Sequence, residues 1–82
     1  MNAVLLADLE TFGFVTVTYT TNRGTVRVMH CTRRLADIPE DVRSGINDPK
    51  LNGPLICCVY DWQNSGFRAF RWDSVIEWNS HD

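Results

Sequence analysis

Alternating apolar and polar positions predict a β-hairpin in the first half of the chain. From Phe14 to Thr21, valine or tyrosine alternates with threonine, which is the pattern of a strand buried on one face. Asn22 and Gly24 tolerate the backbone angles of a tight turn, and an extended pattern resumes from Thr25 to Thr32. The two runs are therefore expected to pair as antiparallel strands.

The second strand of this hairpin is expected to turn Val26 and Val28 inward and Arg27 outward, because successive side chains in a strand point to opposite faces. The alternation is lost over residues 29–31. We expect a bulge or a sharp bend at this place, since such an irregularity lets a strand curl into a barrel.

A short helix is predicted before the hairpin, within residues 1–13. Most of its apolar side chains fall on one helical face, and Gly13 ends the pattern. These apolar positions are Val4, Leu5, Leu6, Leu9 and Phe12. A helix of this length is not stable alone, so we expect it to plug one end of a sheet or to cover a sheet edge. Self-association through the helix is the alternative.

The segment after the hairpin is predicted to be irregular. Pro39 forces the preceding residue away from helical angles, and the run from Pro39 to Arg43 has the proline and acidic residues of a first helical turn. Turn-forming residues from Gly45 to Pro54 predict a loop, which we expect to be variable or functional.

The run from Leu55 to Trp78 predicts three further strands. Leu55 to Tyr60 is apolar enough for a strand buried on both faces, and its connection to the next strand ends at Gly66, which we expect to be left-handed. The next strand is Phe67 to Trp72. The last strand contains Val75 and Ile76 and ends at Trp78, and residues 79–82 form a polar tail. Phe67, Phe70, Val59 and Ile76 are the expected core residues of this half.

The strand from Phe67 to Trp72 carries two arginines on opposite faces. Phe67 and Ala69 share a face with Arg71, whereas Phe70 shares a face with Arg68. Both arginines cannot face solvent from a flat strand. We therefore expect either a strong twist or one arginine at a rim.

Length and composition indicate one small domain, residues 1–82, of mainly β structure with five short strands and a short N-terminal helix. The net charge of −2 argues against a protein that grips duplex DNA over its whole surface, although a local basic patch remains compatible with it. An odd count of three cysteines, two of them adjacent, makes a disulfide framework improbable. Without a signal peptide or an apolar span of membrane length, this predicts a cytoplasmic protein that does not enter a membrane.

Tyr60-Asp61 and the run from Gly66 to Asp73, GFRAFRWD, resemble the WYL domain. In that family a strand ending in Tyr-Asp is followed by a turn and the pattern aromatic-Arg-x-Phe-Arg-x-Asp. Residues 14–78 look like the compact WYL-like, Sm-like SH3 barrels of tailed bacteriophages. The family's Trp-Tyr-Leu falls on Leu55, Ile56 and Cys57, and Ser74 stands where a basic residue is usual.

This resemblance implies a small five-stranded SH3/Sm-like β-barrel that stands alone, without the helix-turn-helix segment of larger WYL proteins. It also implies that Arg68 and Arg71 belong to a binding surface for nucleic acid or nucleotides. Sm-like barrels often pair strand edges, so a dimer or ring through sheet edges is left open. A phage-encoded protein of this kind would act in the host cytoplasm.

Basic and aromatic residues form the candidate ligand-binding set. Its members are Arg27, Arg33, Arg34, Arg68 and Arg71, with Tyr60, Trp62 and Trp72 as stacking partners. Small barrels bind single strands by combining a positively charged groove with aromatic platforms. The alternative interpretation is that these arginines pair with Asp61, Asp73 and Glu77 and only coat the surface.

The chain lacks the spacing of a metal or catalytic motif. His30, Cys31, Cys57, Cys58 and His81 show no C-x-x-C or H-x-x-x-H spacing. A cysteine nucleophile with His30 as base is not expected, because a strand turns His30 away from Cys31. The glycines are dispersed and form no phosphate loop. We therefore predict a non-enzymatic protein without a metal or cofactor.

Two functions follow as hypotheses. The first is a small regulator that binds single-stranded nucleic acid or a nucleotide on the arginine and aromatic face. The second is a protein-interaction module, such as a phage factor that docks on a host protein through a sheet edge, the aromatic surface or the Gly45 to Pro54 loop.

Overall fold

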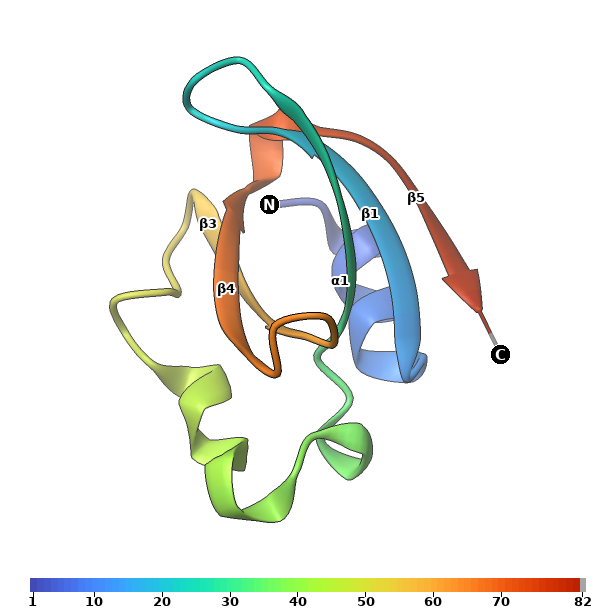
Figure 1. Ribbon diagram of the computed structural model, residues 1–82, viewed down its shortest axis with the longest axis vertical. Coiled ribbons are helices and arrows are strands. Elements are labelled where there is room, and N and C mark those ends of the chain that lie inside the picture. Colours follow the sequence, from blue (N-terminus) through green and yellow to red (C-terminus); the bar gives the residue numbers. More distant parts are fainter. Residues whose placement is uncertain (82) are drawn as a thin grey trace.

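Five antiparallel strands form one sheet in the computed structural model, which describes residues 1–81 (Figure 1). The sheet order is β4-β3-β2-β1-β5, so β4 and β5 are its edges. The strands are β1 Phe14–Thr20, β2 Val26–Thr32, β3 Ile56–Asp61, β4 Gly66–Arg71 and β5 Val75–His81. The expected mainly β fold is confirmed, and closure of the sheet into a barrel stays a prediction.

The predicted N-terminal helix is present as α1, Ala3–Thr11, and it packs against β1, β2 and β5. The side chain of Asn2 accepts a hydrogen bond from the Leu5 backbone N–H at 3.1 Å and so caps the helix. At the other end, the Thr32 hydroxyl donates to the Phe12 carbonyl at 2.7 Å. The Trp78 indole N–H donates to an oxygen of Asp8 at 2.9 Å, which joins α1 to β5.

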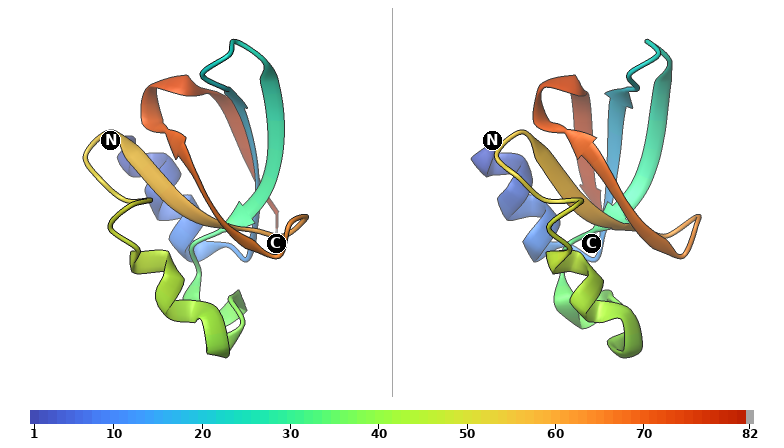
Figure 2. Two further views of the ribbon diagram at one scale, coloured as in Figure 1. Left: turned by 60° about the vertical axis from the view of Figure 1, so that its left-hand side comes forward. Right: turned by 90° about the vertical axis from the view of Figure 1, so that its left-hand side faces the viewer.

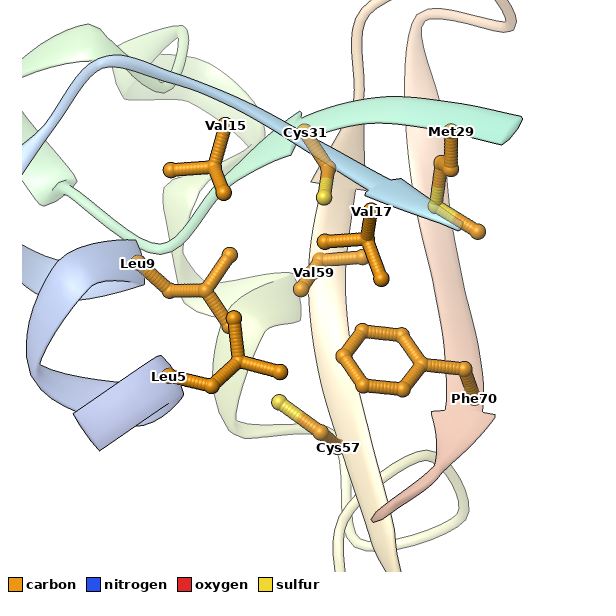
Figure 3. Packing of buried hydrophobic residues seen from close by; sticks show 9 residues of the cluster. All are labelled: Leu5, Leu9, Val15, Val17, Met29, Cys31, Cys57, Val59 and Phe70. Carbon is orange, nitrogen blue, oxygen red and sulfur yellow. The ribbon is translucent and has the colours of Figure 1, made fainter. Parts of the chain in front are cut away.

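The main core lies between α1 and the inner face of the curved sheet (Figure 3). Leu5 and Leu9 of α1 are fully buried and point toward side chains from β1 to β4. The cluster consists of Leu5, Leu9, Val15, Val17, Met29, Cys31, Cys57, Val59 and Phe70. Because α1 supplies two of its largest side chains, the helix is part of the core and not an appendage.

A second, smaller core covers the opposite face of β3. Cys57 to Asp61 are all buried, which confirms a strand enclosed on both sides. Cys58 and Tyr60 pack there against Ile38 and Ile46. Ile46 lies in the 3-10 helix Glu40–Asn47, where the sequence predicts a brief helix. A second 3-10 turn, Leu35–Asp37, precedes it.

The inward face of β2 is opposite to the expected one. Val26 and Val28 are 59% and 51% exposed, whereas Met29 and Cys31 are buried. Cross-strand pairing sets this register, because Val15 and Val17 lie opposite Cys31 and Met29. Alternation continues through residue 29 without the expected bulge, and the irregularity lies between β1 and β5 instead, at Thr18 and Tyr19. Arg27 therefore occupies an inward position.

Two expectations for the C-terminal strand are also wrong. Ile76 is 57% exposed and is not a core residue, since it lies beside the irregularity between β1 and β5. Residues 79–81 belong to β5 and are paired with β1, where a polar tail was expected, while Asp82 lies outside the described residues. A 3-10 turn, Trp72–Ser74, connects β4 to β5. No helix within residues 1–81 has the length and apolarity needed to cross a membrane.

The turn between β3 and β4 places its left-handed residue at Ser65, with φ of 50°, and not at Gly66. We expect Ser65→Gly to raise the free energy of unfolding by about 0.5 kcal/mol, because glycine relieves left-handed strain but adds unfolded-state entropy. Gly66→Ala should keep the fold, since a Cβ there meets only Asn64 O at 3.7 Å. Urea titrations of both variants measure the change in the free energy of unfolding. Unfolding of Gly66→Ala would contradict the assignment of the left-handed residue to Ser65.

Candidate binding groove

The strands β2 and β3 pair only at Cys31 with Asp61 and at Thr32 with Tyr60. Each of them has a longer ladder with its other neighbour. The β1-β2 hairpin and the β3-β4 hairpin therefore diverge beyond this short ladder (Figure 2). An open groove of about 350 Å³ lies between them, and we call it the hairpin groove. It is lined by Tyr19, Thr21, Arg27, Met29, Asp61, Asn64, Arg68 and Ala69.

A second lobe of about 310 Å³ adjoins the hairpin groove. Tyr19, Thr21 and Ala69 line both spaces, so the two lie side by side. The second lobe extends to Arg71 and Ser74 at the end of β4. Three of the candidate arginines, on two strands, thus lie along one surface feature.

Arg27 and Arg68 reach the groove from inward positions of β2 and β4. Arg27 is the cross-strand neighbour of Tyr19, and Arg68 is that of Val59. Both side chains are nevertheless exposed, because the hairpins diverge above them. Within residues 1–81, the ion pairs involve Arg34 and Arg71 but neither of these two arginines. Their charges therefore face the groove without a carboxylate partner.

Asp61 is the acidic residue of the groove, and its carboxylate accepts hydrogen bonds from the adjacent turn. Asp61 is only 4% exposed. One oxygen accepts the Gln63 backbone N–H at 3.0 Å, and the other accepts the Asn64 amide at 2.6 Å. The pairing of this carboxylate with an arginine, which the alternative interpretation predicts, is absent from the described residues.

Arg71 is paired, as the alternative interpretation predicts for one of the arginines. Its Nε and Nη2 donate to the two oxygens of Asp73 at 3.0 and 3.1 Å. This pairing holds the pKa of Asp73 below its ordinary value. Both side chains of the pair are exposed, so it contributes little to stability and leaves Arg71 free to exchange partners.

Arg33 and Arg34 lie outside the hairpin groove. Arg34 pairs with Asp37 at 3.5 Å, one helical turn along the chain. The Nη1 of Arg33 donates to the Cys58 carbonyl and to Asn52 Oδ1, so this side chain supports β3 and the loop before it.

The three predicted stacking residues also lie outside the hairpin groove. Tyr60 is 5% exposed and meets Trp62 edge-on, with ring centroids 5.2 Å apart. The Trp62 indole donates to the Gly13 carbonyl at 2.9 Å. Trp72 meets Phe70 edge-on at 5.8 Å. These rings mainly hold the fold together.

Tyr19 is the aromatic residue of the groove, and it is not among the predicted binding residues. Its half-buried ring lies 6.1 Å from that of Phe70 and lines both lobes. The available signal was its position as the third inward residue of β1, after Val15 and Val17. A correct register of the hairpin would have placed Tyr19 beside Arg27.

No group of three His, Cys, Asp or Glu side chains within the described part of the chain could hold a metal ion. No protein-family model matches the sequence, and no curated protein or solved structure matches the chain. The chemistry of the hairpin groove is therefore the basis for a functional assignment.

Proposed function

We propose that this protein is a non-enzymatic regulatory module that binds single-stranded nucleic acid or a nucleotide in the hairpin groove. One observation carries the proposal. Arg27 and Arg68 come from different strands, enter one groove and have no carboxylate partner among residues 1–81. The likeness of residues 14–78 to WYL-like phage barrels supports the same class of ligand.

The groove chemistry suits a phosphate with an attached base. Guanidinium groups donate paired hydrogen bonds to phosphate oxygens, and two arginines facing one space favour a group with more than one such oxygen. The Tyr19 ring offers a surface on which a base can stack. The volume of about 350 Å³ lies in the range of small-molecule sites. A longer nucleic-acid strand extends along the second lobe toward Arg71. Arg71 then exchanges the Asp73 carboxylate for a phosphate group.

Fluorescence polarisation with labelled single-stranded DNA and RNA, and competition by AMP, test the proposal at two salt concentrations. We expect binding that weakens as salt rises. The Arg27→Ala/Arg68→Ala variant should bind at least about tenfold more weakly, because each lost charged hydrogen bond is worth about 1.5–3 kcal/mol. Tyr19→Leu should weaken binding further, by about 1–3 kcal/mol for one stacked base.

The matched control is Arg34→Ala/Lys50→Ala, which removes the same charge at exposed positions outside the groove. It should bind within about twofold of the natural protein, since it leaves the groove contacts intact. Equal losses in the two double variants would attribute binding to net charge alone. Absence of binding at low salt would also overturn the proposal.

A protein-interaction role is the second candidate, and the free edge of β2 supports it. Residues 26–29 pair with β1 on one side only, and Val26 and Val28 are exposed beside that edge. An extended segment of a host protein could add to this edge as a further strand. A partner recovered after nuclease treatment, and lost in Val26→Asp/Val28→Asp, would favour this function.

Assembly and compartment are part of the proposal. The edges β4 and β5 are the strands through which copies of the chain would pair into a dimer or ring. Light scattering after gel filtration measures this state. Three free cysteines fit the reducing cytoplasm, which is that of the host if the protein is phage-encoded.

A further inference from the structure

A second pocket, which we call the Arg33 pocket, lies between α1, β3 and the segment before β3. Its volume is about 200 Å³, and it is lined mainly by Leu6, Arg33, Asn52, Pro54, Cys57 and Trp72. Pro54 and Trp72 also line an adjoining space of about 250 Å³, whose lining includes the exposed Leu55 and the carboxylate of Asp73. The pocket contains none of the groove residues Tyr19, Arg27 and Arg68.

The guanidinium group of Arg33 is only partly satisfied. Its Nη1 donates to the Cys58 carbonyl and to Asn52 Oδ1, while its Nε is buried without an acceptor among the described residues. Arg33 forms no ion pair with a carboxylate of residues 1–81. A half-buried cation without a counter-charge is unfavourable, so an anion at this place gains free energy on binding.

The neighbouring thiol does not supply the missing negative charge. Burial raises the pKa of Cys57 to about 11, although the nearby Arg33 acts in the opposite direction. At neutral pH the thiol is therefore protonated. The thiol therefore adds no negative charge to balance Arg33. The Glu10 carboxylate, which also raises the pKa of Cys57, forms no ion pair with Arg33 among the described residues.

The other walls of the pocket are largely apolar, so they favour a ligand whose remaining part is an apolar chain. Leu6, Pro54 and Trp72 line the pocket together with Arg33, and Leu55, which lines the adjoining space, is 64% exposed. An apolar chain covers such surface, and one carboxylate head pairs with Arg33. We propose that the Arg33 pocket binds a small amphipathic carboxylate, independently of the hairpin groove.

Titration with octanoate, with octanol as the uncharged comparison, tests the proposal by ¹H–¹⁵N NMR. The indole N–H groups of Trp62 and Trp78 are hydrogen-bonded within the fold, whereas Trp72 lines the pocket. We expect octanoate to shift the Trp72 indole signal in a saturable way and to leave the other two in place. Octanol should bind at least about tenfold more weakly, because it lacks the charge that meets Arg33.

Two variants distinguish octanoate binding in the Arg33 pocket from nonspecific binding to apolar surface. Arg33→Met should lose at least about tenfold in octanoate affinity, while the adjacent Arg34→Met should bind like the natural protein. Because Arg33 also supports β3, Gly53→Leu is the second test. Gly53 lines the pocket, and a Cβ there meets only Ile56 Cγ1 at 3.7 Å, so the backbone accepts a larger side chain at this wall. It should abolish the Trp72 shift.

Equal binding of octanoate and octanol would overturn the proposal. So would an unmoved Trp72 signal in the natural protein, or full octanoate affinity in the Gly53→Leu variant. These readouts do not involve nucleotides, so failure of the groove assignment leaves them unaffected.

Discussion

Replacement of Leu9 by alanine is expected to lower the free energy of unfolding by about 3–5 kcal/mol, the range found when a fully buried leucine is truncated. Leu9 is fully buried and belongs to the main core. A domain of this length has a total stability of about 4–12 kcal/mol. The variant should therefore be largely unfolded or melt far below the natural protein.

The size of this effect follows from the position of α1. The helix closes one end of the core, so a cavity at Leu9 is lined by β1 and β2 side chains that cannot move inward without breaking their ladder. The Leu9 carbonyl also accepts the Arg33 backbone N–H at 2.8 Å, which fixes the helix to the exit of β2. Little relaxation can compensate for the lost side chain.

Val4→Ala on the same helix is the matched control, because Val4 is 65% exposed. It should change the stability by less than about 0.5 kcal/mol. Urea titration followed by far-ultraviolet circular dichroism and by tryptophan fluorescence measures both variants. If Leu9→Ala were as mild as Val4→Ala, α1 would not be part of the cooperative core.

Alkaline pH should destabilise the protein strongly through its three buried thiols. Burial is the main cause that raises the pKa of Cys31, Cys57 and Cys58 above the ordinary value of 9.0, to about 11 for Cys57. In the unfolded chain these thiols ionise near pH 9, whereas in the folded chain they stay protonated. The unfolded state thus binds fewer protons above pH 9, and stability falls as the pH rises.

The expected loss is about 3 kcal/mol between pH 8.5 and pH 10, since each thiol with suppressed ionisation contributes about 1.4 kcal/mol per pH unit. The stability is fully present below pH 9 and is lost as the pH rises toward 11. Urea titrations at a series of pH values measure the slope.

The control is a variant with all three cysteines replaced by alanine. Its absolute stability will be lower because small cavities are created, but its slope between pH 8.5 and pH 10 should be flatter by about 2 kcal/mol per pH unit or more. Identical slopes in the two proteins would exclude the thiols as the cause. Single replacement of Cys31 or of Cys57 should already flatten the slope.

Much of the fold could be read from local patterns. The helix, both hairpins and the strand enclosed on both faces follow from residue periodicity, because Leu5, Leu9, Val15 and Val17 fall where one buried face requires them. Which face of β2 is buried could not be predicted from periodicity. Val26 and Val28 are as apolar as Met29 and Cys31, and only the pairing with β1 decides which set is buried.

The candidate site was predictable only in part, for the same reason. Arg68 could be assigned to the face of Phe70 by alternation, but its exposure depends on where β2 and β3 separate. Arg27 enters the groove because the inward face of β2 is the opposite of the expected one, so that Arg27 points inward and Val26 and Val28 point outward. The edge-on packing of Tyr60 and Trp62 depends on contacts with the second core, which no local pattern encodes.

The pairing of β1 with β5 determines when the sheet can be completed during synthesis. Val17 lies opposite Trp78, and the Trp78 indole reaches back to Asp8, so residues about 60 to 70 positions apart in the chain meet at this ladder. Until residues 75–81 have emerged from the ribosome, β1 has one unpaired edge. Until then this edge of β1 is free to pair with another chain, and contacts of this range predict folding in milliseconds to seconds once β5 is available.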